Sequence, residues 1–267
     1  MMTDWWWAYL ALGVFAGFFG GLLGIGGGSA LVPVLALIYT AKGFPQEHVV
    51  HLALGTAIAT TIFTSASSVW SHHRHQAVNW SVVLEMMPGV VAGAFGGALA
   101  AGWLDPRLLV VAFTLLIYGL ATQMMLDTKP TAIGALPGGV AMSAVGGIIG
   151  LLSSLSATGG ASLTVPFLVK RNIRVHEAIG TAAAVGWMLA MAGTLGYLLS
   201  GVGKPGLPDT SVGYVYTPAL AWIAAASMAI APLGARIAHR TPAKTLKRAF
   251  AVVLYLLATN MLVSSFK

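Results

Sequence analysis

Two stretches of this chain carry the same pattern of clustered glycine followed by Val-Pro: "GIGGGSALVP" at residues 24–33 and "ATGGASLTVP" at residues 157–166. Both lie in strongly apolar surroundings, where the chain otherwise has the composition of long helices. Glycine costs about 1 kcal/mol relative to alanine in a helix interior, so each stretch is expected to break a helix. The placement of these two breaks decides how the rest of the chain is organised.

The composition is that of an integral membrane protein. The 267 residues are 57% hydrophobic and only 8% charged, whereas a soluble domain carries about 25% charged residues. The absence of cysteine excludes disulfides, thiolate metal sites and a cysteine nucleophile. The net charge of +7 does not indicate nucleic acid, because the basic residues are thinly spread and flank apolar segments. We expect no cleavable signal peptide, because the start lacks a basic residue and carries Asp4.

Ten apolar segments follow one another along the chain. They lie at roughly 5–23, 29–42, 48–70, 80–102, 106–127, 134–157, 161–170, 175–200, 215–238 and 244–266. Spanning a bilayer takes about 20 helical residues, and most segments reach that length. The segment after Gly160 reaches Lys170 within about ten residues, which rise only about 15 Å as a helix. Such an arm must begin near the middle of the membrane.

The second half of the chain repeats the first. Aligning the two glycine stretches places Pro33 on Pro166, "HLALGTA" from His51 matches "HEAIGTA" from His176, and "YGLATQMM" matches "YLLATNML" further on. We therefore predict two repeats, 1–127 and 132–267, joined by a linker at 128–131. The predicted fold is an all-α polytopic membrane protein with two inverted-topology repeats. Each repeat is a broken, re-entrant helix hairpin followed by three transmembrane helices.

The distribution of Lys and Arg predicts the orientation. With three crossings per repeat, ten of the 14 basic residues fall on one face. These are Arg74, Lys129, Lys170, Arg171, Arg174, Arg236, Arg240, Lys244, Lys247 and Arg248. The positive-inside rule makes this face, with the 128–131 linker, cytoplasmic and places both termini outside.

The two glycine turns predict an anion site near the midplane. Non-helical backbone at that depth is tolerated only when buried in protein or lining a wet cavity. A helix starting after each turn, with Pro33 and Pro166 at or near its first turn, presents unpaired N–H groups and a positive dipole end. Glycine lets a ligand approach this backbone closely. The predicted binding residues are Gly26, Gly27, Gly28, Ser29, Thr158, Gly159, Gly160 and Ser162. The alternative is that the glycines serve only close helix packing.

Opposed broken helices in inverted repeats are typical of secondary transporters. The doubled glycine cluster followed by "VP", with "GT" downstream in each half, resembles the sulfite exporter TauE/SafE family. The resemblance covers essentially the whole chain and implies a bacterial inner-membrane permease that exports sulfite, an organosulfonate or a related sulfur-containing anion. The second turn has Ala157 and Thr158 where the first has Gly24 and Ile25, which makes the two sides of the site unequal.

Further residues carry hypotheses with competing explanations. Thr56 and Thr181 occupy matching positions and either reach the anion site or bond to their own backbone. Glu85, an acid within a span, either carries a proton or reaches the interface. The run "HHRHQ", residues 72–76, resembles a metal cluster but is better explained as a solvated basic loop.

Catalytic motifs are absent from the sequence. It has no H-E-x-x-H helix, G-x-S-x-G elbow or P-loop, so we expect no enzyme, cofactor or metal. An anion channel remains the alternative to a transporter, with an intramembrane enzyme a distant third. The expected partners are the anion and the bilayer, while the oligomeric state is left open.

Overall fold

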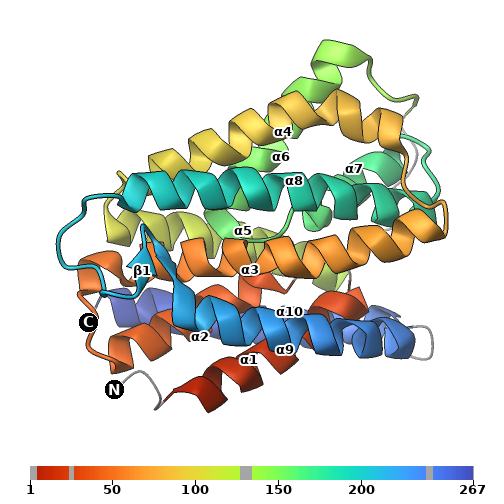
Figure 1. Cartoon of the computed structure of the whole chain (residues 1–267). Helices are drawn as coiled ribbons and strands as arrows, with labels where there is room; N and C mark the ends of the chain where they lie inside the picture. Colours follow the sequence, from red (N-terminus) through yellow and green to blue (C-terminus); the bar gives the residue numbers. More distant parts are fainter. Residues whose placement is uncertain (1–4, 24–26, 127–133, 239–242, 267) are drawn as a thin grey trace.

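The computed structural model describes residues 5–23, 27–126, 134–238 and 243–266, which form a bundle of helices with one small β-hairpin (Figure 1). The helices are α1 (Trp6–Leu23), α2 (Gly28–Ala41), α3 (Gln46–Arg74), α4 (Trp80–Ala101), α5 (Pro106–Leu126), α6 (Gly139–Ser156), α7 (Ala161–Lys170), α8 (Val175–Gly201), α9 (Thr217–Ala238) and α10 (Ala243–Ser265). The hairpin consists of β1 (Ser211–Val212) and β2 (Val215–Tyr216), paired antiparallel.

The helix lengths confirm a polytopic α-helical membrane protein. Within the described ranges, six helices are long and apolar enough to cross a membrane: α3, α4, α5, α6, α8 and, from Leu246, α10. By contrast, α2 has 14 residues and α7 has 10, which is shorter than a full crossing requires.

The two longest helices, α3 and α8, form the centre of the bundle. Their apolar windows are 83% and 67% buried, more than those of the other four long helices. They run antiparallel, because Gly55 of α3 faces Tyr197 while Ser65 faces Gly186. Glycine at these positions lets the two backbones approach closely. Any element that contacts the middle of α3 or α8 therefore lies at mid-depth.

Each half of the chain packs its first helix against the fourth helix of the other half. On α1, Gly13, Gly17 and Gly21 face α9, with Gly17 against the backbone of Ser227. On α4, Gly89, Gly93 and Gly97 face α6 in the same way, with Gly93 against Gly147. Spacing of four residues places each set of glycines on one helix face. Helix α1 runs parallel to α9, and α4 runs parallel to α6. The two pairs therefore pack through the same kind of glycine contact.

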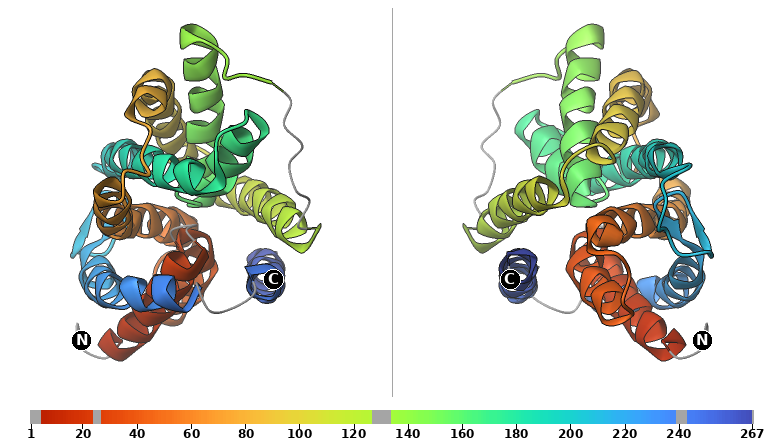
Figure 2. Two further views of the ribbon diagram at one scale, coloured as in Figure 1. Left: turned by 90° about the vertical axis from the view of Figure 1, so that its right-hand side faces the viewer. Right: turned by 90° about the vertical axis from the view of Figure 1, so that its left-hand side faces the viewer.

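The fifth helices of the two halves exchange matching hydrogen bonds. Tyr118 of α5 is bonded to Thr259 of α10 (2.6 Å between the hydroxyl oxygens), and Tyr255 of α10 is bonded to Thr122 of α5. Figure 2 shows α5 and α10 side by side at one flank of the bundle. Inversion of the halves relative to a membrane stays a prediction. So does the division into 1–127 and 132–267, whose linker at 128–131 lies outside the described residues.

Two local features differ from the sequence-based expectations. Helix α3 continues to Arg74, so His72 and His73 are helical rather than part of a loop. The β-hairpin was not predicted; its turn uses Gly213 at φ 54°, a backbone conformation that suits glycine. The hairpin places Tyr214 and Tyr216 against one end of the bundle, where both are buried.

Candidate functional site

Both glycine turns end in a left-handed glycine that caps a short helix. Gly27 (φ 67°, ψ −8°) precedes α2, and Gly160 (φ 78°, ψ −28°) precedes α7. This conformation is costly for residues with a Cβ atom. Neither helix start has a side-chain cap. The first N–H groups of α2 and α7 are therefore free of side-chain acceptors and can donate to a ligand.

The two turns touch each other. A Cβ atom on Gly28 would collide with the carbonyl oxygen of Ala157, the residue that ends α6 in a left-handed conformation at φ 50°. Ala157 is itself fully buried. The start of α2 and the end of α6 are thus in backbone contact, and only a glycine fits at position 28.

The point where the turns meet lies midway along the bundle. The Cβ position of Gly28 is 3.2 Å from the hydroxyl oxygen of Thr61, close to the midpoint of α3. The carbonyl oxygen of Gly159 packs directly on Gly186, close to the midpoint of α8. Because α3 and α8 are each long enough to cross a membrane, both turns lie deep between their ends.

Each short helix begins with a buried serine that lacks a partner. Ser29 of α2 is 0% exposed and Ser162 of α7 is 8% exposed, and neither hydroxyl forms a hydrogen bond with any described group. Leaving a buried hydroxyl unpaired costs about 1–3 kcal/mol. Thr158 is also buried, and its hydroxyl lies 3.2 Å from that of Ser156. Two unsatisfied hydroxyls beside two uncapped helix starts form a polar site that is suited to an acceptor ligand.

The prolines lie just after the first turn of each short helix. Pro33 and Pro166 are each the sixth residue of their helix, because α2 begins at Gly28 and α7 at Ala161. In a helix interior a proline removes the bond to the carbonyl four residues earlier. In both helices that carbonyl belongs to the unpartnered serine, so the first turn is less internally bonded than in an ordinary helix.

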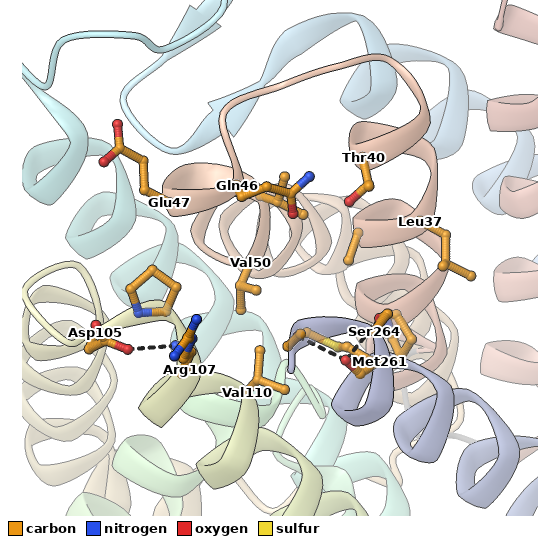
Figure 3. A pocket seen from close by; sticks show the side chains of 15 residues that line it. Leu37, Thr40, Gln46, Glu47, Val50, Asp105, Arg107, Val110, Met261 and Ser264 are labelled. Atoms are coloured by element: carbon orange, nitrogen blue, oxygen red, sulfur yellow. Dashed lines mark hydrogen bonds between the residues drawn. The ribbon is translucent and has the colours of Figure 1, made fainter. Parts of the chain in front are cut away.

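A cavity of about 630 Å³ leads from one end of the bundle to Pro33. Figure 3 shows Leu37 and Thr40 of α2 on one side, Arg107 of α5 on the opposite side and Val50 of α3 between them. Arg107 is exposed and lies at the mouth of the cavity. The mouth also carries acidic groups, Glu47 and Asp105. The Asp105 carboxylate accepts a hydrogen bond from the backbone N–H of Arg107 (2.8 Å), and this contact starts α5. The cavity approaches the first glycine turn from this end of the bundle.

Comparison with known proteins identifies the family. The sequence profile described as "Sulfite exporter TauE/SafE" matches residues 9–261, almost the whole chain. The chain belongs to the TauE/SafE family. A Haemophilus influenzae relative named "Probable membrane transporter protein" is 36% identical over 94% of this chain and 96% of its own length. A Bacillus subtilis relative, "Probable membrane transporter protein YunE", is 25% identical over 95% of this chain and 96% of its own length. No solved structure matches the chain.

In this TauE/SafE protein, most of the predicted turn residues that the structure describes are brought together. Gly27, Gly28 and Ser29 start α2, which contacts the second turn, and Thr158, Gly159, Gly160 and Ser162 form that turn and the start of α7. Gly26 lies outside the described residues.

The structure does not bring Thr56 and Thr181 to the turns. The Thr56 hydroxyl accepts hydrogen bonds from the backbone N–H of Tyr216 (3.0 Å) and from the Tyr39 hydroxyl (3.3 Å). The Thr181 hydroxyl accepts one from the backbone N–H of Asn79 (3.0 Å). Each therefore holds the residue just before the fourth helix of the other half, near one end of the bundle. Neither bonds to its own helix, which was the alternative explanation.

Glu85 stays a hypothesis as a proton carrier. Its side chain is exposed on α4, and it does not line the cavity that leads to Pro33. In the described ranges no group of three or more His, Cys, Asp or Glu side chains is placed to hold a metal ion. The histidines of the "HHRHQ" run thus have no metal-like arrangement there.

Sequence reasoning missed several polar residues around the turns. Thr61 lies against Gly28, and Ser65 lies near Gly186. The buried hydroxyl of Thr164 on α7 has no hydrogen-bond partner among the described groups. The sequence does point to Thr61 and Ser65, because the run "TTIFTS" at residues 60–65 places four hydroxyl side chains in the middle of an apolar span.

Proposed function

We propose that this TauE/SafE protein is a secondary transporter that exports a small sulfur-containing anion, such as sulfite or an organosulfonate, by alternating access. The family profile and the names of the relatives support a membrane transporter. The substrate class and the outward direction rest on the family description. The proposed location is a bacterial inner membrane, with both termini on the extracytoplasmic side.

The observation that carries the proposal is the contact at mid-depth between the start of α2 and the turn that precedes α7, with an uncapped start and an unpartnered serine on each of the two helices. The N–H groups of such a start bear about half a positive charge and favour anions. A sulfite or sulfonate group offers three oxygen acceptors, enough to engage donors from both helices and the hydroxyls of Ser29 and Ser162. The proposed site consists of Gly26, Gly27, Gly28, Ser29, Thr158, Gly159, Gly160 and Ser162.

The chemistry of the site favours release as well as binding. No described Lys or Arg lines the contact between the turns, so the anion is held by dipoles and hydroxyls rather than by a full opposite charge. A site that conducts must bind strongly enough to fill and weakly enough to empty. The cavity that ends at Pro33 provides an approach to α2 from one end of the bundle.

Counterflow in proteoliposomes tests the proposal. Vesicles preloaded with unlabelled sulfite and diluted into labelled sulfite should accumulate label transiently and saturably. The double variant Ser29→Ala, Ser162→Ala should lose this signal. Ser227→Ala, which removes a buried hydroxyl that bonds only within α9, should keep it. Saturation without stimulation by internal sulfite would identify a channel and overturn the transporter.

Thermal unfolding of the purified protein supplies the substrate class. A ligand that binds the folded state raises the unfolding temperature by mass action. Sulfite, thiosulfate, sulfate, sulfoacetate and taurine should be compared at equal ionic strength with chloride. We expect one or more of the sulfur anions to raise the unfolding temperature. Equal unfolding temperatures in all of them and in chloride would contradict the proposed anion site.

A further inference from the structure

A second cavity lies at the end of the bundle where α3 meets α4. This groove of about 420 Å³ is lined mainly by Val69, Trp70, His73 and Arg74 of α3, Trp80 of α4 and Trp187 of α8. We call it the tryptophan groove. Figure 1 shows this end of α3 on the right, next to the start of α8. The groove is far from the mouth of the cavity that leads to Pro33, which lies at the opposite end of α3.

The groove opens on the apolar outside of the bundle. Trp70 is 61% exposed, and Phe63, two helical turns earlier on the same face of α3, is 40% exposed. On α8, Leu195 is likewise exposed. Exposed aromatic and aliphatic side chains on a membrane-spanning helix face lipid, and tryptophan concentrates at the level of the headgroups. The walls of the groove are therefore built to contact acyl chains.

The outer end of the groove carries a positive charge. The Arg74 guanidinium stacks over the Trp70 ring, with its carbon 4.9 Å from the ring centroid. Stacking uses the face of the guanidinium and leaves its N–H edge free for a planar two-point contact with phosphate. No Asp or Glu lines the tryptophan groove. Its charge thus differs from that of the cavity mouth that contains Glu47 and Asp105.

Two further donors belong to residues that line the groove. The indole N–H of Trp187 is buried and has no hydrogen-bond partner in the described structure. The indole N–H of Trp80 donates to Nδ1 of His73 (3.2 Å). With Nδ1 as the acceptor, the neutral ring carries its proton on Nε2, which is the second donor. Trp187 follows Gly186 on α8, and Gly186 faces Ser65 of α3. Ser65 lies well before Arg74 along α3. Trp187 therefore lies deeper than the guanidinium, toward the midpoint of α8, at a depth where a lipid offers its acyl chain.

We propose that the tryptophan groove binds one anionic phospholipid of the adjacent leaflet. The phosphate pairs with Arg74, and an acyl chain lies along Val69 and the Trp187 ring. Basic pockets between transmembrane helices bind anionic headgroups in this way. Lys170, Arg171 and Arg174 end α7 and precede α8 at the same end of the bundle, which adds to the positive field. The site is separate from the glycine turns and does not rest on the proposed function.

Native mass spectrometry of the purified full-length protein tests the proposal. The protein should retain one molecule of dioleoyl phosphatidylglycerol at least fivefold better than dioleoyl phosphatidylcholine. Arg74→Gln should abolish this preference, and Trp187→Ala, which removes the ring along which the acyl chain lies, should reduce retention at least twofold. The control is Arg171→Gln, because Arg171 also stacks on an aromatic ring, that of Phe167 (5.8 Å), at the same end but outside the groove.

The other outcomes overturn the assignment. Equal retention of the two lipids, or an equal loss in Arg171→Gln and Arg74→Gln, would mean that the groove has no specific headgroup site. Full competition by soluble glycerol phosphate would indicate a site for a free phosphate instead of a lipid. Where Arg74→Gln is poorly folded, quenching of tryptophan fluorescence by brominated phosphatidylglycerol provides a second measurement. Quenching in Trp187→Ala equal to that of the wild type would contradict the proposal.

Discussion

Gly28 lies against the carbonyl oxygen of Ala157 so closely that no Cβ atom fits between them. This contact joins the two glycine turns, although they belong to different halves of the chain. It holds the start of α2 against the turn that leads into α7. The geometry of the proposed anion site therefore depends on one residue that has no side chain.

Gly28→Ala should separate the two turns. Overpacking a tight contact costs about 1–3 kcal/mol, so we expect a lower unfolding temperature and loss of stabilisation by sulfite. Gly119→Ala is the matched control, because a Cβ atom at this helical position of α5 meets nothing within 4 Å. A Gly28→Ala protein with normal unfolding and normal sulfite stabilisation would show that the turn contact is not needed.

Removing the unpartnered hydroxyls should separate binding from stability. A hydrogen bond to a charged group is worth about 1.5–3 kcal/mol, so Ser29→Ala and Ser162→Ala should each weaken anion binding about tenfold or more. The ligand-free unfolding temperature should stay the same or rise, because a buried unsatisfied group is removed. Calorimetric titration with the anion that stabilises best measures the affinity, and thermal unfolding without ligand measures the stability. A drop in stability at unchanged affinity would make these serines structural.

The helices were largely predictable from the sequence because apolar length and glycine breaks determine them locally. The ends of α2, α4, α5 and α7 fall within one or two residues of the predicted segments. The hairpin was missed although "SVGYVY" at residues 211–216 alternates apolar residues around a glycine. Two-residue strands give too short a pattern to stand out beside long helices.

The composition of the site was harder to predict than its location. The glycine turns were identified from their repetition, but Thr61 reaches Gly28 only because of how α2 crosses α3, and crossing geometry cannot be read from spacing alone. Thr56 and Thr181 were assigned to the turns because they match between the halves. The structure gives that match another reason, since both residues anchor the partner half.

Thr56→Val should destabilise the protein without changing anion affinity. Valine keeps the shape but leaves the backbone N–H of Tyr216 and the Tyr39 hydroxyl without this acceptor, at a cost of about 1–3 kcal/mol. Thr181→Val should act in the same direction, through the N–H of Asn79. Thermal unfolding and sulfite titration of both variants measure the two quantities. Weaker anion binding with an unchanged unfolding temperature would show that these threonines belong to the anion site.

Glu85→Gln tests the hypothesis of proton coupling. If the carboxylate carries a proton during transport, the variant should lose the pH dependence of sulfite counterflow between pH 5 and pH 8 while binding stays intact. Glu47→Gln is the matched comparison. Glu85 and Glu47 are both exposed, but only Glu47 lines the cavity that leads to Pro33. An unchanged pH profile in Glu85→Gln would eliminate it as the carrier.

The orientation of the chain can be measured cleanly because it contains no cysteine. Asn172→Cys, between α7 and α8, marks the end with Arg74 and Lys170, and Gly203→Cys, after α8, marks the opposite end. Both positions lie in turns and are exposed. The positive-inside rule predicts that an impermeant maleimide labels intact cells at position 203 alone, and at position 172 only after the membrane is opened. The reverse pattern would invert the proposed topology and would place the tryptophan groove in the outer leaflet. It would leave the contact between Gly28 and Ala157 at the same depth, because that depth is set by the middles of α3 and α8.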